Sequence, residues 1–374
     1  MQVILGVIFH FIGGFASGSF YMPFKKVRGW NWESYWIIGG LFSWLIVPPL
    51  AAFLTIPGFT AIISETSFDT IKYVLLFGVL WGIGGCTYGL GVRYLGVSLG
   101  SSIILGLCMV FGALVPAIYY EFTKTAGKDP ISIYFNTKWG LIVLGGMLVC
   151  IIGIIIAGKA GMMKEKELRA ASSGKAADPS PTDAHGAPAG KTEYKFALGM
   201  TVGIISGILS ACFNFGIEAG EPMKAVADAA WKTAHPAEEG KFLFGNNVTY
   251  VVLLWGGLAT NLVWCMILNA RNKSFGDYTN KKTPLLRNYL FAALAGTTWF
   301  LQFFFYGMGE SKLGNGASSW ILHMAFIILI ANMWGVIANE WKGTSKKTKQ
   351  TIAIGIAVII VSVLVVGYGN SLKP

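Results

Sequence analysis

The sequence predicts an all-α integral membrane protein with ten transmembrane helices, arranged as two inverted five-helix repeats. Three observations lead to this prediction. The 374 residues are 54% hydrophobic and only 13% charged, whereas a soluble domain carries about 25% charged residues. The hydrophobic residues are grouped in long runs that suit a bilayer. Finally, segments far apart in the chain resemble each other in pairs.

The ten predicted spans follow from the length of each hydrophobic run. A helix that crosses the hydrocarbon core needs about 20 mainly apolar residues. Runs of this kind cover residues 3–23, 34–56, 71–92, 97–120, 138–158, 196–217, 247–269, 287–308, 313–338 and 351–369. The connections around Gly96 and Gly314 are so short that each should be a tight hairpin.

The repeats are visible as residue identities at a constant spacing. Segment 81–96 matches segment 299–314 at six positions after a shift of 218 residues (299 minus 81). A shift of 193 residues (198 minus 5) aligns the first span with the sixth in the same manner. Because each copy holds an odd number of spans, the two copies must enter the membrane from opposite sides, as in many secondary transporters. The residues that recur after the shift of 218 are Trp81, Tyr88, Gly89, Gly91, Leu95 and Gly96. Those that recur after the shift of 193 are Leu5, Gly6, Gly14, Ser17 and Phe20.

A segment between the fifth and sixth spans divides the chain. Residues 159–195 separate an N-terminal five-helix repeat, 1–158, from a C-terminal five-helix repeat, 196–374. The dividing segment is rich in Ala, Pro, Gly and Ser, and such a composition cannot bury a core. We therefore predict a disordered linker, in which His185 is a solvated residue.

The basic residues predict how the chain is oriented. Of the 29 Lys and Arg residues, 20 fall in the loops on one side of the predicted bundle, the linker included. Because basic loops stay inside the cell, we expect a multi-pass protein of the inner membrane with a cytoplasmic linker and both termini external. Basic loops facing an anionic leaflet also account for the net charge of +11, so nucleic acid is not a predicted partner. The five cysteines lie inside apolar runs without metal-ligand spacing, and no metal or cofactor is predicted.

Polar residues inside the spans are the first candidates for function, because a polar group in hydrocarbon is costly unless it faces the bundle interior. His10, Ser17 and Tyr21 fall on one helical face of the first span, and Asn214 falls on the matching face of the sixth. An intramembrane histidine that titrates near neutral pH can carry a proton. We predict proton coupling by His10, with His323 in the ninth span as the reserve. The alternative is helix packing, in which a histidine only bonds a backbone carbonyl.

The repeated aromatic residues are the second group of candidates. Trp299, Gln302 and Tyr306 share one helical face, as do Trp81 and Tyr88. Flat rings with polar edges can stack on a small neutral ligand and bond its rim. An interfacial aromatic belt is the alternative. The predicted substrate-binding residues are Trp81, Tyr88, Asn214, Trp299, Gln302, Tyr306 and Trp320.

The spans are almost free of charge, which narrows the substrate class. Arg93 lies near the end of the third span, and the acids Glu218 and Glu310 lie near span ends, where a solvated outer rim is the simpler interpretation. An anionic substrate would require a buried cation, and a cationic one a buried carboxylate. The sequence therefore predicts a small neutral polar substrate.

These motifs resemble one known family, the L-rhamnose–proton symporters. The resemblance lies in His10 within its run, in the segments 20–33, 76–84, 88–96 and 299–306, in Ser319-Trp-Ile-Leu-His-Met324, and in Asn339-Glu-Trp341. It extends from the first span to the last and leaves out the linker and the loop after the sixth span. Glu218 and Glu221 depart from the family, which is more usually neutral or basic there.

The resemblance implies a drug/metabolite transporter fold and uptake of L-rhamnose, or the related L-lyxose, with a proton by alternating access. Apart from the resemblance, we predict no enzymatic activity, and no obligatory protein partner is evident in the sequence. The alternatives are an exporter or exchanger of another small metabolite on the same fold, an integral-membrane enzyme, and a sensor without transport. The spans contain no nucleophile motif or paired carboxylates for an enzyme.

Overall fold

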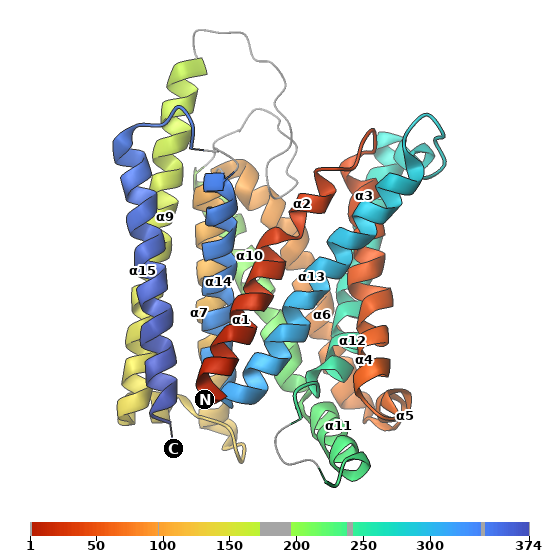
Figure 1. Ribbon diagram of the computed structural model, residues 1–374, viewed down its shortest axis with the longest axis vertical. Helices are drawn as coiled ribbons and strands as arrows, with labels where there is room; N and C mark the ends of the chain where they lie inside the picture. The colour runs from red at the N-terminus through yellow and green to blue at the C-terminus, as the bar shows by residue number, and fades with distance from the viewer. Residues whose placement is uncertain (1, 96, 173–195, 238–241, 338–340, 374) are drawn as a thin grey trace. The chain divides into compact units, whose positions relative to one another are not determined.

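Helices are the regular secondary structure of the part of the chain that the computed structural model describes, residues 2–95, 97–172, 196–237, 242–337 and 341–373, and no strand occurs there. The helices form two compact units (Figure 1). Unit 1 comprises Met1–Ile83 and Cys212–Gly314, and unit 2 comprises Gly84–Ala211 and Asn315–Pro374. Each unit therefore combines segments from the first and second parts of the sequence.

Unit 1 holds the N-terminal helices and those that follow the sixth predicted span. They are α1 (Gln2–Ser19), α2 (Tyr21–Phe24), α3 (Trp32–Gly40), the π-helix η1 (Leu41–Ile46), α4 (Val47–Thr55), α5 (Phe59–Glu65), α11 (Glu221–Ala234), α12 (Asn246–Asn272), the 3₁₀-helix η2 (Ser274–Tyr278) and α13 (Leu285–Leu313). Unit 2 holds α7 (Val97–Thr123), α8 (Ile131–Asn136), α9 (Lys138–Ser172), α14 (Gly316–Ile337) and α15 (Lys346–Ser371). Two helices, α6 (Phe68–Leu95) and α10 (Phe196–Ala219), contribute to both units.

The predicted all-α membrane architecture is confirmed at the level of its helices. Nine stretches of the described residues are long and apolar enough to cross a bilayer. The ninth predicted span, 313–338, corresponds to α14, of which the described residues contain the apolar stretch Gly316–Ile330, shorter than those nine. Ten spans in two inverted repeats therefore stay a prediction. The turn predicted at Gly96 lies outside the described residues, whereas Gly314 ends α13 in the left-handed conformation that glycine adopts without strain.

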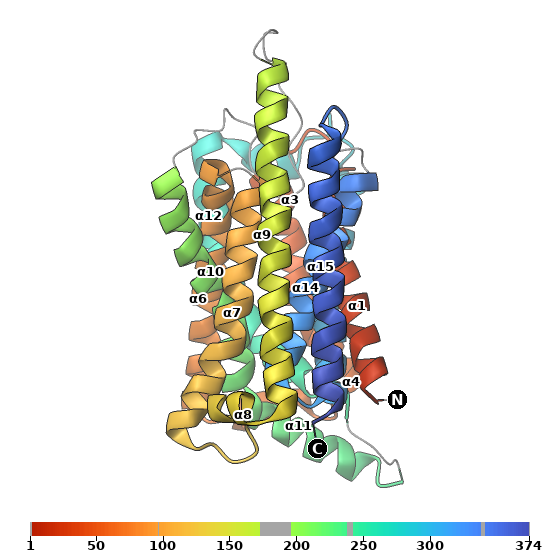
Figure 2. The same ribbon diagram turned by 90° about the vertical axis from the view of Figure 1, so that its left-hand side faces the viewer.

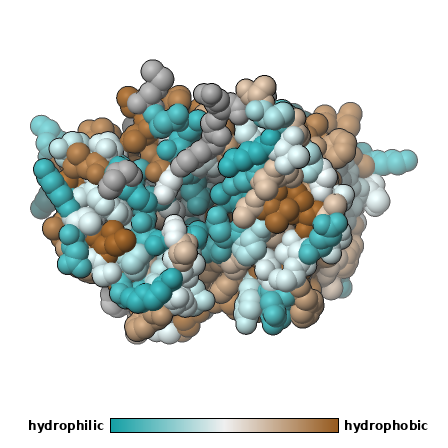
Figure 3. Space-filling model, turned by 90° about the horizontal axis from the view of Figure 1, so that it is seen from below, coloured by the Kyte–Doolittle hydropathy of each residue, from teal (hydrophilic) through white to brown (hydrophobic). Residues whose placement is uncertain are grey.

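The outer faces of the helices are apolar. Large side chains such as Phe53, Leu54, Phe122 and Leu364 are between 67% and 81% exposed. Exposed apolar area on this scale would destabilise a protein in water and is typical of lipid contact. The view from below, by contrast, shows hydrophilic residues over much of the surface, with the hydrophobic ones in separate patches (Figure 3). The protein is thus a multi-pass membrane protein.

Helix α9 is longer than the sequence predicts. It continues from the fifth span through residues 159–172, which the sequence analysis assigns to the linker. Lysine, glutamate, leucine and alanine dominate this stretch, and all four favour helix. The rest of the predicted linker, residues 173–195 with His185, lies outside the described residues.

In unit 2, α9 and α15 run side by side over most of their length (Figures 1 and 2). Glycines allow the close approach: Gly153 packs against Ile359, and Gly355 packs against Ala157. Where α15 begins, the carboxylate of Glu167 accepts hydrogen bonds from the Ser345 backbone N–H and from the hydroxyls of Ser345 and Thr348, each 2.7 Å long. Glu167 thereby joins the end of α9 to the start of α15.

We expect Glu167→Gln to lower the melting temperature at neutral pH. The hydrogen bonds from Thr348 and Ser345 hold the pKa of the Glu167 carboxyl below its usual value of 4.5. A lowered pKa in the folded state means stabilisation that is present above the usual pKa and lost as the pH falls through the lowered one. The difference in thermal unfolding between variant and wild type should therefore shrink below about pH 4. Glu65→Gln, which removes an exposed carboxylate at the end of α5, serves as the control.

In unit 1, helices α1 and α3 pack closely on α13. Gly6 faces Leu313, and Gly39 faces Gly296 so closely that a Cβ on Gly296 would overlap the Gly39 carbonyl group. Ser43 fixes the same contact, since its hydroxyl lies 3.0 Å from the carbonyl oxygens of both Gly39 and Gly296. Such close contacts between backbones are typical of membrane helices, in which small residues line the interface.

Gly296→Val should destabilise unit 1 by about 1–3 kcal/mol or more, the usual range for overpacking, because backbone atoms of Gly39 cannot move aside as a side chain could. Thermal unfolding in detergent measures the effect. Gly145→Val is the matched control, since a Cβ on Gly145 of α9 meets no atom within 4 Å. Equal melting temperatures for the two variants would contradict the packing described for α3 and α13.

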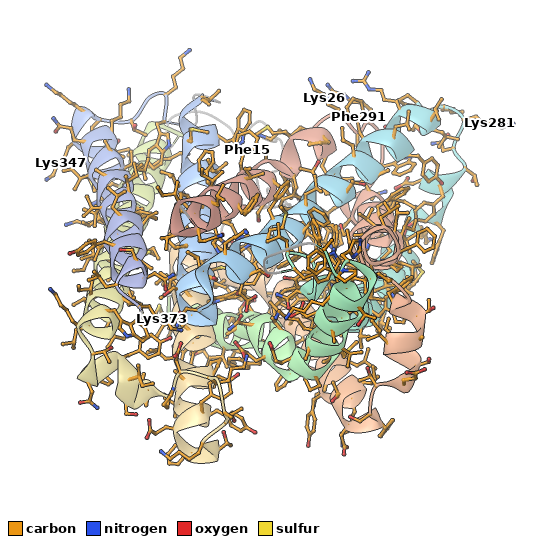
Figure 4. The ribbon with its side chains drawn as sticks, turned by 60° about the horizontal axis from the view of Figure 1, so that its bottom comes forward. Phe15, Lys26, Lys281, Phe291, Lys347 and Lys373 are labelled. Carbon is orange, nitrogen blue, oxygen red and sulfur yellow. The ribbon has the colours of Figure 1, made fainter. Side chains whose placement is uncertain are left out.

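A polar network closes one end of unit 1. The buried carboxylate of Glu33 accepts a 2.6 Å hydrogen bond from Ser274, whose hydroxyl oxygen also lies 3.0 Å from Asn269 Oδ1. Ser34 donates to Asp277 at 2.8 Å. These bonds join the start of α3 to the end of α12 and to η2, and basic side chains such as Lys26 and Lys281 project at this end of the unit (Figure 4). In unit 2, Lys347 and Lys373 mark the two ends of α15.

Candidate functional site

His10 lies at the contact between α1 and α13. Its side chain is completely buried, and its ring meets that of Tyr306 edge to face, with centroids 5.3 Å apart. A Cβ on Gly309 would lie 2.7 Å from His10 Nε2, so only glycine leaves room for the imidazole there. The last turns of α13 thus provide a fitted site for the histidine.

Tyr306 links His10 to α10. The Tyr306 hydroxyl donates to Asn214 Oδ1 at 3.4 Å, and both side chains are buried. Three residues that the sequence analysis selects from three different spans, His10, Asn214 and Tyr306, therefore lie in one connected group. Gln302 is buried one turn earlier on α13, and its amide donates to the Trp299 carbonyl at 2.9 Å.

The aromatic residues of unit 1 continue this group. Phe213, next to Asn214, stacks on Phe303 with centroids 4.0 Å apart and meets Trp81 at 5.2 Å. Trp81 in turn lies 5.7 Å from Trp299, the residue predicted to be its counterpart in the repeat. The structure thus brings the two tryptophans together, and a series of ring and hydrogen-bond contacts, joined through the neighbouring residues Phe213 and Asn214 of α10, leads from His10 to Trp299.

Trp44 belongs to the same cluster, although the sequence analysis does not select it. Its ring lies 6.0 Å from Trp299 and 6.4 Å from Trp81, nearly perpendicular to both. With Ser43 and Gly296, it lines a small recess in unit 1. Trp44 lies in an apolar run, and no polar residue stands three or four positions from it. Its own N–H inside a span is therefore the sequence signal by which it could be selected.

Three of the predicted site residues belong to unit 2. Trp320 is buried on α14, its Nε1–H donates to the Cys108 carbonyl at 3.0 Å, and its ring packs on Gly112. His323 lies one turn further along α14 and is completely buried, while Tyr88 on α6 is half-buried. The indole of Trp320 already has its hydrogen-bond partner within the fold, which favours a packing role for this residue over substrate binding.

The acids after the sixth span form a cluster at one end of unit 1. Asn246 donates to Glu310 Oε2 at 2.8 Å, and Lys224 lies 3.2 Å from Asp228 and 3.6 Å from Glu221. Burial raises the pKa of Asp228 above its usual value, although Lys224 opposes this shift. Burial alone would lower the pKa of Lys224, and the carboxylates of Glu221, Asp228 and Glu310 raise it above its usual value. The simple solvated rim expected here is thus an ordered, partly buried network.

The sequence matches one protein family and its members along nearly its whole length. The model of the L-rhamnose-proton symport protein (RhaT) family matches residues 1–178 and 182–372. An L-rhamnose-proton symporter of Yersinia pestis (strain Pestoides F) is 35% identical over 372 residues, which are 98% of each chain. One from Pectobacterium carotovorum subsp. carotovorum (strain PC1) is 34% identical over the same length. The chain therefore belongs to the L-rhamnose-proton symport protein family.

Proposed function

We propose that the chain takes up L-rhamnose, or the related L-lyxose, together with a proton across the cell inner membrane. The observation that carries this proposal is the contact series from His10 to Trp299 in a chain of this family. It joins a buried titratable ring to a group of aromatic side chains, none of which carries a charge, and this combination suits a neutral sugar moved with a proton. The alternating-access mechanism belongs to the same proposal.

In this proposal, His10 carries the proton and His323 is the reserve. Trp81 and Trp299 stack on the sugar, while Asn214, Tyr306, Gln302 and Tyr88 bond its hydroxyls. Trp320 stays a predicted substrate contact through the face of its ring, since its N–H bonds the Cys108 carbonyl. Indole rings suit the apolar C–H face of a sugar, and amide and phenol groups can both donate and accept at its hydroxyls.

The proposed arrangement in the membrane is ten spans in two inverted repeats, with the linker in the cytoplasm and both termini outside. The excess of basic residues in the linker and in the loops that follow α2 and α12 supports this orientation. Two copies of an odd number of spans would enclose a site that can open to either side in turn.

Uptake of labelled L-rhamnose into proteoliposomes, with and without an imposed pH gradient, tests the function. We expect accumulation only when the outside is more acidic. Counterflow with a panel of labelled sugars and amino acids then separates this function from an exporter or exchanger of another metabolite. Accumulation of another solute, with L-rhamnose neither moved nor competing, would contradict the proposal.

A further inference from the structure

The recess beside Trp44 lies at a break in the regular helix. Pro48 and Pro49 cannot donate backbone hydrogen bonds to the carbonyls of Trp44 and Leu45, and their rings would clash with those carbonyls in an α-helix. The chain responds with the π-helix η1, in which the Val47 N–H reaches back to the Phe42 carbonyl. Single π-turns of this kind are frequent at functional sites, because they shift side chains out of the α-helical register.

The indole N–H of Trp44 is the second observation. The side chain is only 4% exposed, and its Nε1 has no hydrogen-bond partner among the residues that the structure describes. A buried donor without a partner is costly, because it has given up its hydrogen bond to water and gains none in the protein. By contrast, the Trp36 indole, which lines the same recess, donates to Asn261 Oδ1 at 3.1 Å.

The recess that Trp44 lines is small. It has a volume of about 10 Å³, which is the room that a single water-sized group needs. The Ser43 hydroxyl, which also lines it, has one proton to donate and faces two backbone carbonyls, so its lone pairs remain able to accept. A hydroxyl group, which both accepts and donates, matches this pair of side chains.

We infer that Trp44 donates a hydrogen bond from Nε1 to one hydroxyl of the transported sugar and thereby selects sugars that carry this hydroxyl. The inference rests on the proposed function and adds a residue to it. The hydroxyl enters the recess beside Ser43, and the ring of the sugar lies against the indoles of Trp299 and Trp81, which Trp44 contacts edge-on. A site that bonds a hydroxyl rejects the analogue that lacks it, because its own polar group then loses a partner.

The test compares Trp44→Phe with Trp36→Phe, using L-rhamnose and the set of analogues that each lack one hydroxyl. Competition against labelled L-rhamnose uptake gives the apparent affinity of each sugar. Trp44→Phe keeps an aromatic ring and loses the N–H, so it should lower the apparent affinity for L-rhamnose by about 3–10-fold. One analogue should bind the wild type more weakly than L-rhamnose does, by the same factor. For this analogue, Trp44→Phe should cause no further loss of apparent affinity. Trp36→Phe should change the apparent affinity for every sugar by the same factor, because the Trp36 N–H bonds Asn261 of the protein and not the sugar.

Two results would overturn the inference. An equal loss for L-rhamnose and all analogues in Trp44→Phe would mean that the N–H bonds a fixed water or acts only through packing. No loss for any sugar would mean that the N–H bonds nothing during transport. Failure of the proposed function is a different result, since wild-type protein would then take up no L-rhamnose, and the same comparison would be made with deoxy analogues of the sugar that it does transport.

Discussion

Proteoliposomes that contain His10→Ala should no longer accumulate L-rhamnose in response to a pH gradient. A symporter that moves one proton per sugar reaches about tenfold accumulation for each pH unit, since a tenfold ratio corresponds to about 1.4 kcal/mol. Without a group that takes up the proton, the ratio should fall to about one. His10 is the completely buried histidine of unit 1, and its ring is fitted between Tyr306 and Gly309.

The controls for His10→Ala separate coupling from folding. Sugar counterflow, which needs no net proton movement, should persist in the variant. His235→Ala should behave as wild type, because His235 stacks on Trp231 at the end of α11, outside the candidate spans. His323→Ala tests the reserve. If His10→Ala and His323→Ala both retained full accumulation, the assignment of the proton to a histidine would be wrong.

The sequence was sufficient to predict the helices and to select several residues that the structure brings together, for a simple physical reason. Runs of about 20 apolar residues have few alternatives to crossing a membrane, and the constant spacing between Trp81 and Trp299 selected two residues that the structure places 5.7 Å apart. The group formed by His10, Asn214 and Tyr306 was likewise accessible, because polar residues inside apolar runs are conspicuous.

What the sequence could not predict depends on contacts between distant segments. Trp320 is a tryptophan inside an apolar run, as Trp299 is. Its N–H nevertheless bonds the Cys108 carbonyl, on a helix more than 200 positions away in the sequence. Trp44 was missed because its significance comes from the π-turn before Pro48 and from the rings that surround it. Hydropathy identifies spans and not short surface helices, so it gives no signal for the helix Glu221–Ala234 in the loop after the sixth span.

Trp299→Ala should have the second large effect, on affinity for the sugar. The ring contacts Trp44, Trp81 and Phe303, so its removal takes away a stacking surface and also loosens the other rings. Loss of a large apolar contact is worth about 1.5–3 kcal/mol, which corresponds to about a tenfold to hundredfold rise in the KM for L-rhamnose. Trp299→Phe keeps a flat ring and should lose much less.

Trp264→Ala is the matched control for Trp299→Ala, since Trp264 on α12 is 40% exposed and therefore faces outward. We expect its KM to stay at the wild-type value, because a lipid-facing ring contributes to anchoring and not to the sugar site. The three variants together distinguish stacking from general damage. A stacking role predicts that the KM for L-rhamnose is highest for Trp299→Ala, lower for Trp299→Phe and lowest for the wild type, and that Trp264→Ala leaves it unchanged. Equal KM values for Trp299→Ala and Trp264→Ala would place the sugar away from this aromatic cluster, even if L-rhamnose uptake itself were confirmed.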